Sequence, residues 1–192
     1  MISLSRLANR LKLKTFTQAF SEARGGAAAV EFALIAPILI VLYLGLAELT
    51  LGMMASRRTS HLAATVGDLA AQSESLTDAN VSDIFDIGTS MLQPFTTTGT
   101  VLKIRLSCVK MSTANKAEVQ WSDGRNLTKY ANNYVLTNIT TTQLPQGESL
   151  IVTEVEYAYT SPFTQFLPSI STFKDTYYHH PRTGTTVTRK AS

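Results

Sequence analysis

An unbroken apolar run near the N-terminus constrains this chain more than any other feature. The run extends from Phe32 to Ala47 and, after Glu48, continues almost to Arg57. A helix needs roughly 20 largely apolar residues to span the hydrocarbon core of a membrane, so this run is long enough. In a chain of 192 residues, little else is available to surround such a helix in a soluble core. The sequence therefore predicts a transmembrane helix, which we place at residues 27–56.

Positive charge is concentrated before this run. Residues 1–26 contain five Lys or Arg and one acidic residue, Glu22, for a net charge of +4. The whole chain carries +3, so the other 166 residues carry −1. A nucleic-acid-binding surface needs a basic stripe with interleaved aromatic residues. The near-neutral remainder has no such stripe, and we expect no nucleic-acid partner.

The flanking charges also predict an orientation. Cationic residues beside a membrane span tend to stay in the cytoplasm, and only Arg57 and Arg58 follow the span closely. We therefore expect a cytoplasmic basic leader at residues 1–26 and an extracytoplasmic head at residues 57–192.

Two helical patterns follow the apolar run. The first continues the N-terminal helix to about Gln72 through apolar residues at helical spacing: Leu62, Ala63, Val66, Leu69 and Ala70. The second predicts a helix from Thr77 to Gln93, with Asp78 or Asn80 as the cap. Its apolar face would contain Ile84, Phe85, Ile87, Met91 and Leu92.

Alternation with a period of two then predicts strands. Residues 101–110 and 117–121 form a natural hairpin, and Asp123-Gly124 would supply the next turn. Residues 151–159 form another strand, in which Glu154 and Glu156 could lie across from Lys103 and Arg105. A final strand at 183–189 is expected to be weak. Residues 126–142 and 161–181 are interpreted as loops packed on the head. The predicted fold class is α+β, with a long N-terminal transmembrane helix continuing into a small antiparallel β-sheet head.

Side chains that could carry chemistry are scattered. The chain has no G-x-S-x-G motif, no glycine-rich phosphate loop and no H-E-x-x-H motif. Cys108 is the single cysteine, and its place on the apolar face of a strand favours an inert buried thiol over a nucleophile paired with His61. His179 and His180 are adjacent and have no third metal ligand at a suitable spacing. We expect no catalytic residue, cofactor, metal or small-molecule substrate, and hence no enzyme.

Glu31 stands at the start of the apolar helix. An ionised carboxylate in hydrocarbon costs a few kcal/mol unless it is paired, so Glu31 needs either a partner or a place among the lipid headgroups. The helix N-terminus would stabilise it in the headgroups. The residue types alone leave both readings open.

The residues around Glu31 resemble a known processing site. The chain has a short basic leader, followed by Gly26, small or apolar residues, Glu31 and Phe32. This order of residues is similar to the cleavage site of Flp-type pilins and related pseudopilins. The whole stretch resembles the TadE-like proteins of the Flp (tight-adherence, Tad) pilus system, as does the C-terminal segment Tyr177–Arg182. The stretch in question reads GAAAVEFALIAPILIVLYLGLAELTLG.

This resemblance implies a pilin-like fold, a role and a set of partners. A membrane prepilin peptidase would cut between Gly26 and Ala27, and Glu31 would pair with the N-terminal amine of a neighbouring pilin or pseudopilin subunit. Phe32 would be part of the same subunit-assembly site. A major Flp pilin is far shorter than this chain, so the head points to a minor pilin or pseudopilin of an adhesive pilus in the bacterial inner membrane. TadG-like relatives are much longer.

Two other functions fit the same helix. The chain could be a single-pass anchored binding or sensor domain that is not cleaved. It could also be a secreted protein whose signal peptide ends at Gly45-Leu46-Ala47, a small-x-small sequence. The second alternative would place Glu31 and Pro37 inside the apolar core of an unusually long signal peptide.

Overall fold

The computed structural model describes residues 24–163 and 170–190. The chain forms two compact units, one ending at Ala47 and one beginning at Glu48. Most of the predicted leader, residues 1–23, lies outside the described residues. The division into leader, transmembrane helix and head at residues 26/27 and 56/57 stays a prediction.

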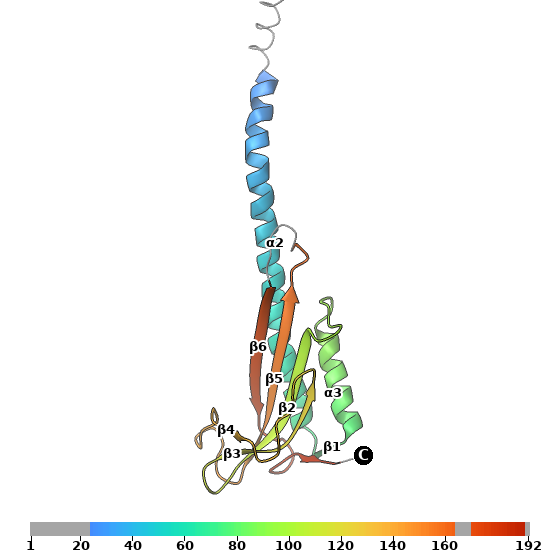
Figure 1. The fold of residues 1–192 in the computed structure, drawn as a ribbon, viewed down its shortest axis with the longest axis vertical. Helices are drawn as coiled ribbons and strands as arrows, with labels where there is room; N and C mark the ends of the chain where they lie inside the picture. Colours follow the sequence, from blue (N-terminus) through green and yellow to red (C-terminus); the bar gives the residue numbers. More distant parts are fainter. Residues whose placement is uncertain (1–23, 164–169, 191–192) are drawn as a thin grey trace, which may run out of the picture. The chain divides into compact units, whose positions relative to one another are not determined.

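Helix α2 extends from Arg24 to Ala71 and passes without interruption through Pro37 (Figure 1). Its burial changes along its length. From Ala55 onward one side of the helix is buried at helical spacing, at Ala55, Thr59, Leu62, Ala63, Val66 and Ala70. The predicted amphipathic continuation of the first helix is therefore confirmed.

Strand β1 (Ser75–Leu76) leads into helix α3 (Asp78–Met91). The helix begins one residue after its cap, Thr77, whose hydroxyl accepts a hydrogen bond from the Asn80 amide while the Asn80 side chain accepts one from the Thr77 amide. This reciprocal arrangement satisfies two amides that the first turn leaves unpaired. The prediction of Asp78 or Asn80 as the cap was wrong, although Asn80 completes the motif. Ile87, predicted to face the core, is 48% exposed.

The head is built on a five-stranded antiparallel sheet in the order β4-β3-β2-β5-β6. A separate parallel pair joins β1 to β7 (Thr188–Arg189). The α+β fold with a long apolar helix and an antiparallel sheet is thus confirmed. The strands of the larger sheet are β2 (Leu102–Met111), β3 (Ala117–Arg125), β4 (Val135–Leu136), β5 (Ser149–Thr160) and β6 (Ile170–His179).

The predicted charge pairs lie across β2 and β5. Lys103 is opposite Glu156, and Arg105 is opposite Glu154. Lys103 Nζ lies 3.6 Å from Glu156, and Arg105 donates two hydrogen bonds of 2.7 Å to the Glu154 carboxylate. The register deduced from alternating residue types is therefore correct.

The two faces of the sheet have separate hydrophobic cores. On one face, α2 and α3 pack over Ile104, Leu106, Ile151 and Val155. The other face is covered by the connection between β3 and β5, from which Ile139 and Leu144 are buried. This connection was predicted to pack on the head as a loop, and apart from the short β4 it does.

A β-bulge in the β2–β3 hairpin moves side chains between these faces. Cys108 pairs with Trp121 but Val109 pairs with Val119, which leaves Gln120 as the extra residue. An extra residue breaks the alternation of a strand. Trp121 therefore belongs to the core under the helices, whereas Val119 belongs to the opposite core. The strict alternation expected over residues 117–121 would have placed both on one face, and the bulge prevents this.

Three further predictions about the strands were wrong. Residues 170–179 form β6, and each of them pairs with a residue of β5, although this segment was interpreted as part of a loop. Asp123-Gly124 lies inside β3 rather than in a turn. The final strand contains only the two residues of β7, because most of the threonine-rich segment 183–189 has no strand partner among the described residues.

Gly67 allows α2 to approach the sheet closely. A Cβ at this position would lie 2.5 Å from Nδ1 of His179 and 2.7 Å from Oγ1 of Thr153. Gly67 itself is buried, as is Thr153 on β5. Contacts this short require the side chains of His179 and Thr153, or the elements that carry them, to shift.

We expect Gly67→Ala to destabilise the head by about 1–3 kcal/mol, the usual cost of overpacking a core, despite the gain in helix propensity. Gly52→Ala is the matched control because a Cβ there meets nothing within 4 Å. Thermal unfolding of the detergent-solubilised protein, followed by circular dichroism, measures both. If Gly67→Ala unfolds at the wild-type temperature, the close approach of α2 to the sheet does not contribute to stability.

Candidate functional site

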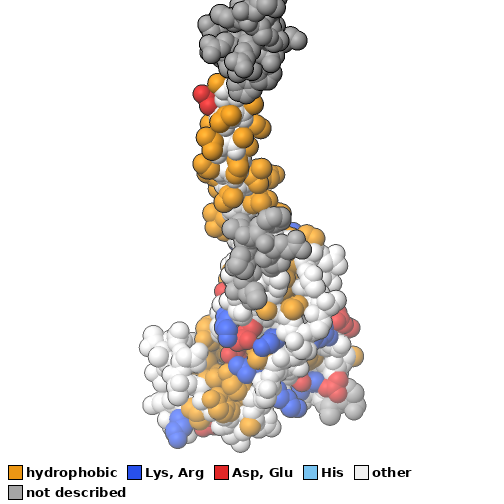
Figure 2. All heavy atoms as spheres, turned by 45° about the horizontal axis from the view of Figure 1, so that its top comes forward, with side chains coloured by type: hydrophobic (Ala, Val, Ile, Leu, Met, Phe, Trp, Pro, Cys, Tyr) orange, Lys and Arg blue, Asp and Glu red, His pale blue; other side chains and the backbone are white. Residues whose placement is uncertain are grey.

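The N-terminal part of α2 presents apolar side chains in every direction. Large hydrophobic residues from Val30 to Leu46 are 53–71% exposed, except Leu44, which is partly buried. Figure 2 shows hydrophobic side chains over this segment. Its most apolar 18-residue window has a mean hydropathy of 2.4 and none of it is buried. The core helix of a soluble protein would be mostly buried, so these side chains require a different apolar environment.

The free energy available from such an environment is large. Burying one large apolar side chain is worth about 1.5–3 kcal/mol, and about ten of them are exposed between residues 30 and 46. Removing them from water would therefore stabilise the protein by more than 10 kcal/mol. A lipid bilayer or the helices of other subunits could each supply that burial.

The predicted processing and assembly residues lie near the N-terminal end of the described part of this helix. Gly26 and Ala27 are helical and exposed, and a Cβ at Gly26 would meet nothing within 4 Å. Glu31 follows Ala27 by four residues, so the two share one face of the helix. Glu31 and Phe32 are exposed, Phe32 to 70%. Among the described residues, no side chain forms a hydrogen bond or ion pair with Glu31.

A second carboxylate of α2, Glu48, has a partner in the head. Ser161, just after β5, donates a hydrogen bond to Oε2 of Glu48, and the Ser161 hydroxyl also accepts one from the Phe163 amide. Burial raises the pKa of nearby Tyr159, and the negative charge of Glu48 adds to this effect. The sequence gave no sign of this partner, because Ser161 lies 113 residues away.

Arg58 connects α2 to the C-terminal end of α3. Its guanidinium donates a 3.1 Å hydrogen bond to the Met91 carbonyl and a further one to the Gln93 carbonyl. The last carbonyls of a helix lack helical partners and carry partial negative charge. A cation there both satisfies them and interacts favourably with the helix dipole.

The residues considered for catalysis are not brought together. Cys108 is fully buried, with Sγ 3.6 Å from the Thr186 hydroxyl, and burial raises the pKa of its thiol. His61 is exposed on α2. His179 is directed at Gly67, and burial lowers its pKa. Within residues 24–163 and 170–190, no group of three or more His, Cys, Asp or Glu could hold a metal ion.

Comparison with known families gives one match. Residues 26–67 match the model of the family described as TadE-like protein. The match begins at Gly26 and lies entirely within α2, so the sheet contributes nothing to it. Comparison with curated proteins and with solved structures finds no match.

The family match and the exposed helix together suggest a membrane-anchored protein associated with the Tad pilus. The resemblance predicted from the sequence is therefore confirmed: residues 26–67 match the TadE-like family.

Proposed function

We propose that this chain is a minor pilin or pseudopilin used in the assembly of a Flp/Tad-type adhesive pilus. The observation that carries the proposal is a TadE-like helix, starting at Gly26, whose apolar side chains are exposed on all sides. In this proposal residues 27–56 anchor the chain in the inner membrane, and the head, residues 57–192, is extracytoplasmic. Its partners are other pilin and pseudopilin subunits and a prepilin peptidase.

Packing and backbone conformation support a processing role for Gly26. The folded chain has no steric need for glycine there, because a Cβ would meet nothing within 4 Å and the residue lies in a right-handed helix. A peptidase, by contrast, benefits from a residue without a side chain next to the scissile bond.

Cleavage is therefore expected between Gly26 and Ala27. Wild-type protein extracted from membranes should have Ala27 as its N-terminal residue, and Gly26→Leu should accumulate in the longer form because the bulky side chain obstructs the peptidase. N-terminal sequencing and intact mass measure both. Intact full-length wild-type protein would instead support the uncleaved anchored domain, and a start after Ala47 would support the secreted protein.

Glu31 is the candidate contact between subunits. Cleavage would create an α-amino group on Ala27 with an ordinary pKa near 8, so that it is largely protonated at neutral pH. A carboxylate and an ammonium that leave water together cost less free energy than either alone. Glu31, which no described residue of its own chain neutralises, suits the amine of a neighbouring subunit. Phe32 would pack beside this pair.

Substituting Glu31 tests this pairing. Glu31→Gln keeps the size and removes the charge, and Glu31→Ala removes both. Each variant should be inserted and largely cleaved, while crosslinking to partner pilins falls at least about tenfold, because losing one member of a desolvated pair costs several kcal/mol. Glu148→Gln, an exposed carboxylate of the head, is the control. Normal crosslinking and piliation by Glu31→Ala would reduce Glu31 to an interfacial charge.

The orientation is tested with reporter fusions. A reporter enzyme that works only in the periplasm should be active when fused after Ser192, because the basic leader is expected to stay in the cytoplasm. A cytoplasm-only reporter fused at the same position should be inactive. The opposite pair of results would overturn the proposed topology.

A further inference from the structure

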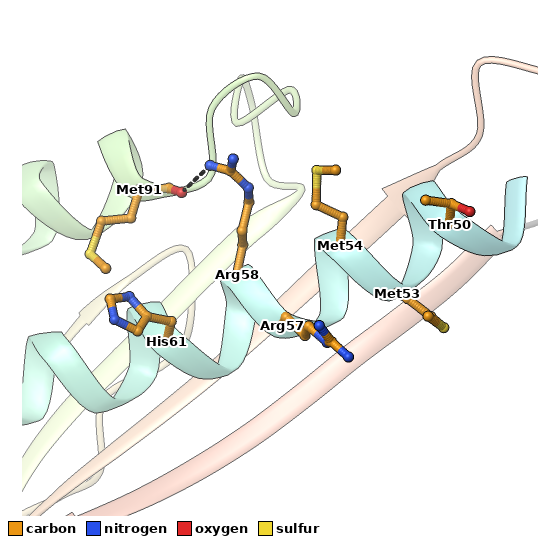
Figure 3. A pocket seen from close by; sticks show the side chains of 7 residues that line it. All are labelled: Thr50, Met53, Met54, Arg57, Arg58, His61 and Met91. Carbon is orange, nitrogen blue, oxygen red and sulfur yellow. Dashed lines mark hydrogen bonds between the residues drawn. The ribbon is translucent and has the colours of Figure 1, made fainter. Parts of the chain in front are cut away.

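A hollow of about 650 Å³ lies between α2 and the end of α3 (Figure 3). Its apolar lining is made of three methionines, Met53 and Met54 on α2 and Met91 on α3. In Figure 3, Met54, Arg58 and His61 are directed toward the α3 side, whereas Met53 and Arg57 are directed away from it. Methionine side chains adapt their shape to an apolar ligand. The hollow can therefore accept a flexible apolar group.

The polar lining contains two cations, Arg57 and Arg58. Arg57, Arg58 and His61 border the hollow, and no Asp or Glu does so among the described residues. Arg58 donates only to main-chain carbonyls within the described part of the chain. For Arg57 and His61, no hydrogen bond or ion pair to another described residue is present. The site thus combines uncompensated positive charge with an apolar surface.

The place of the lining residues in the sequence indicates which kind of ligand the hollow binds. Arg57 is the first charged residue after the predicted transmembrane helix, residues 27–56, so its side chain is expected at the level of the lipid headgroups. Cationic side chains at that level attract anionic lipids. A phospholipid offers both a phosphate for the cations and glycerol and acyl groups for the methionines.

We propose that this hollow binds the headgroup region of an anionic membrane phospholipid. Arg58 and His61, which are directed toward α3, face the phosphate, Arg57 adds positive charge at the border of the hollow, and Met54 and Met91 contact the apolar part of the lipid. This inference rests on the proposed membrane anchoring but not on pilus assembly. It assigns the head a lipid contact in addition to its subunit contacts.

The test uses the full chain in bilayer nanodiscs that contain equal amounts of phosphatidylglycerol and phosphatidylcholine. Native mass spectrometry after release from the nanodiscs should show retained phosphatidylglycerol in preference to phosphatidylcholine. Arg57→Gln should lower the retained phosphatidylglycerol about fivefold, the effect expected for one cation at an anionic membrane surface. Lys116→Gln is the control, since it removes one exposed cation from the turn between β2 and β3. It should retain wild-type amounts.

Each other outcome has a defined meaning. Equal retention of both lipids, or wild-type retention by Arg57→Gln, would overturn the lipid site. Displacement of the lipid by an equal concentration of soluble glycerol phosphate would also overturn it, because the methionines would then contribute nothing. Failure of the wild-type chain to enter nanodiscs would instead overturn the anchoring, which separates the two proposals. Unchanged thermal unfolding of Arg57→Gln shows that the head remains folded.

Discussion

The head depends on the packing of residues 55–70 of α2 against the sheet. Leu62 and Val66 belong to the same core as β2 and β5, and α3 packs beside them, where Gly88 approaches Val66. At Gly67 the helix comes close enough to bury two polar atoms, Oγ1 of Thr153 and Nδ1 of His179, which have no hydrogen-bond partner among the described residues. An unsatisfied buried polar group costs about 1–3 kcal/mol. The free energy of the apolar contacts around Gly67 must outweigh that cost. Because the helix supplies these contacts, we do not expect the sheet to keep this arrangement without it.

The sequence predicted the features that depend on local periodicity. The continuation of α2 after Ala55 followed from apolar residues at helical spacing, and the pairing of Arg105 with Glu154 followed from alternation in two strands. Features that depend on distant partners were missed. Strand β6 is rich in aromatic and polar residues and precedes Pro181, and only its pairing with β5 makes it a strand. The bulge at Gln120 was missed for the same reason, because an extra residue is defined only relative to the partner strand.

The candidate processing and assembly residues stay a prediction. Gly26, Ala27, Glu31 and Phe32 could be selected because they lie within seven residues and resemble a known pattern. The hollow beside Arg57 could not be predicted, because Met91 reaches it from another helix. Arg57-Arg58 itself was noted only as flanking charge. The capping of α3 by Arg58 likewise became visible only when the end of α3 was placed beside α2.

The two carboxylates of α2 differ in a way that bears on assembly. Glu48 accepts a hydrogen bond from Ser161 within the head, whereas Glu31 has no partner among the described residues. If the apolar part of α2 moves from lipid to a bundle of subunit helices, burial of its hydrophobic surface contributes little free energy, because lipid chains are as apolar as leucine. Polar contacts and close packing at small residues must then drive the transfer. Glu31 is a carboxylate of the apolar segment with no side-chain partner among the described residues, so it is available for such a contact. The amine that Glu31 needs does not exist before cleavage. In this proposal the subunit would therefore stay in the membrane until its leader is removed.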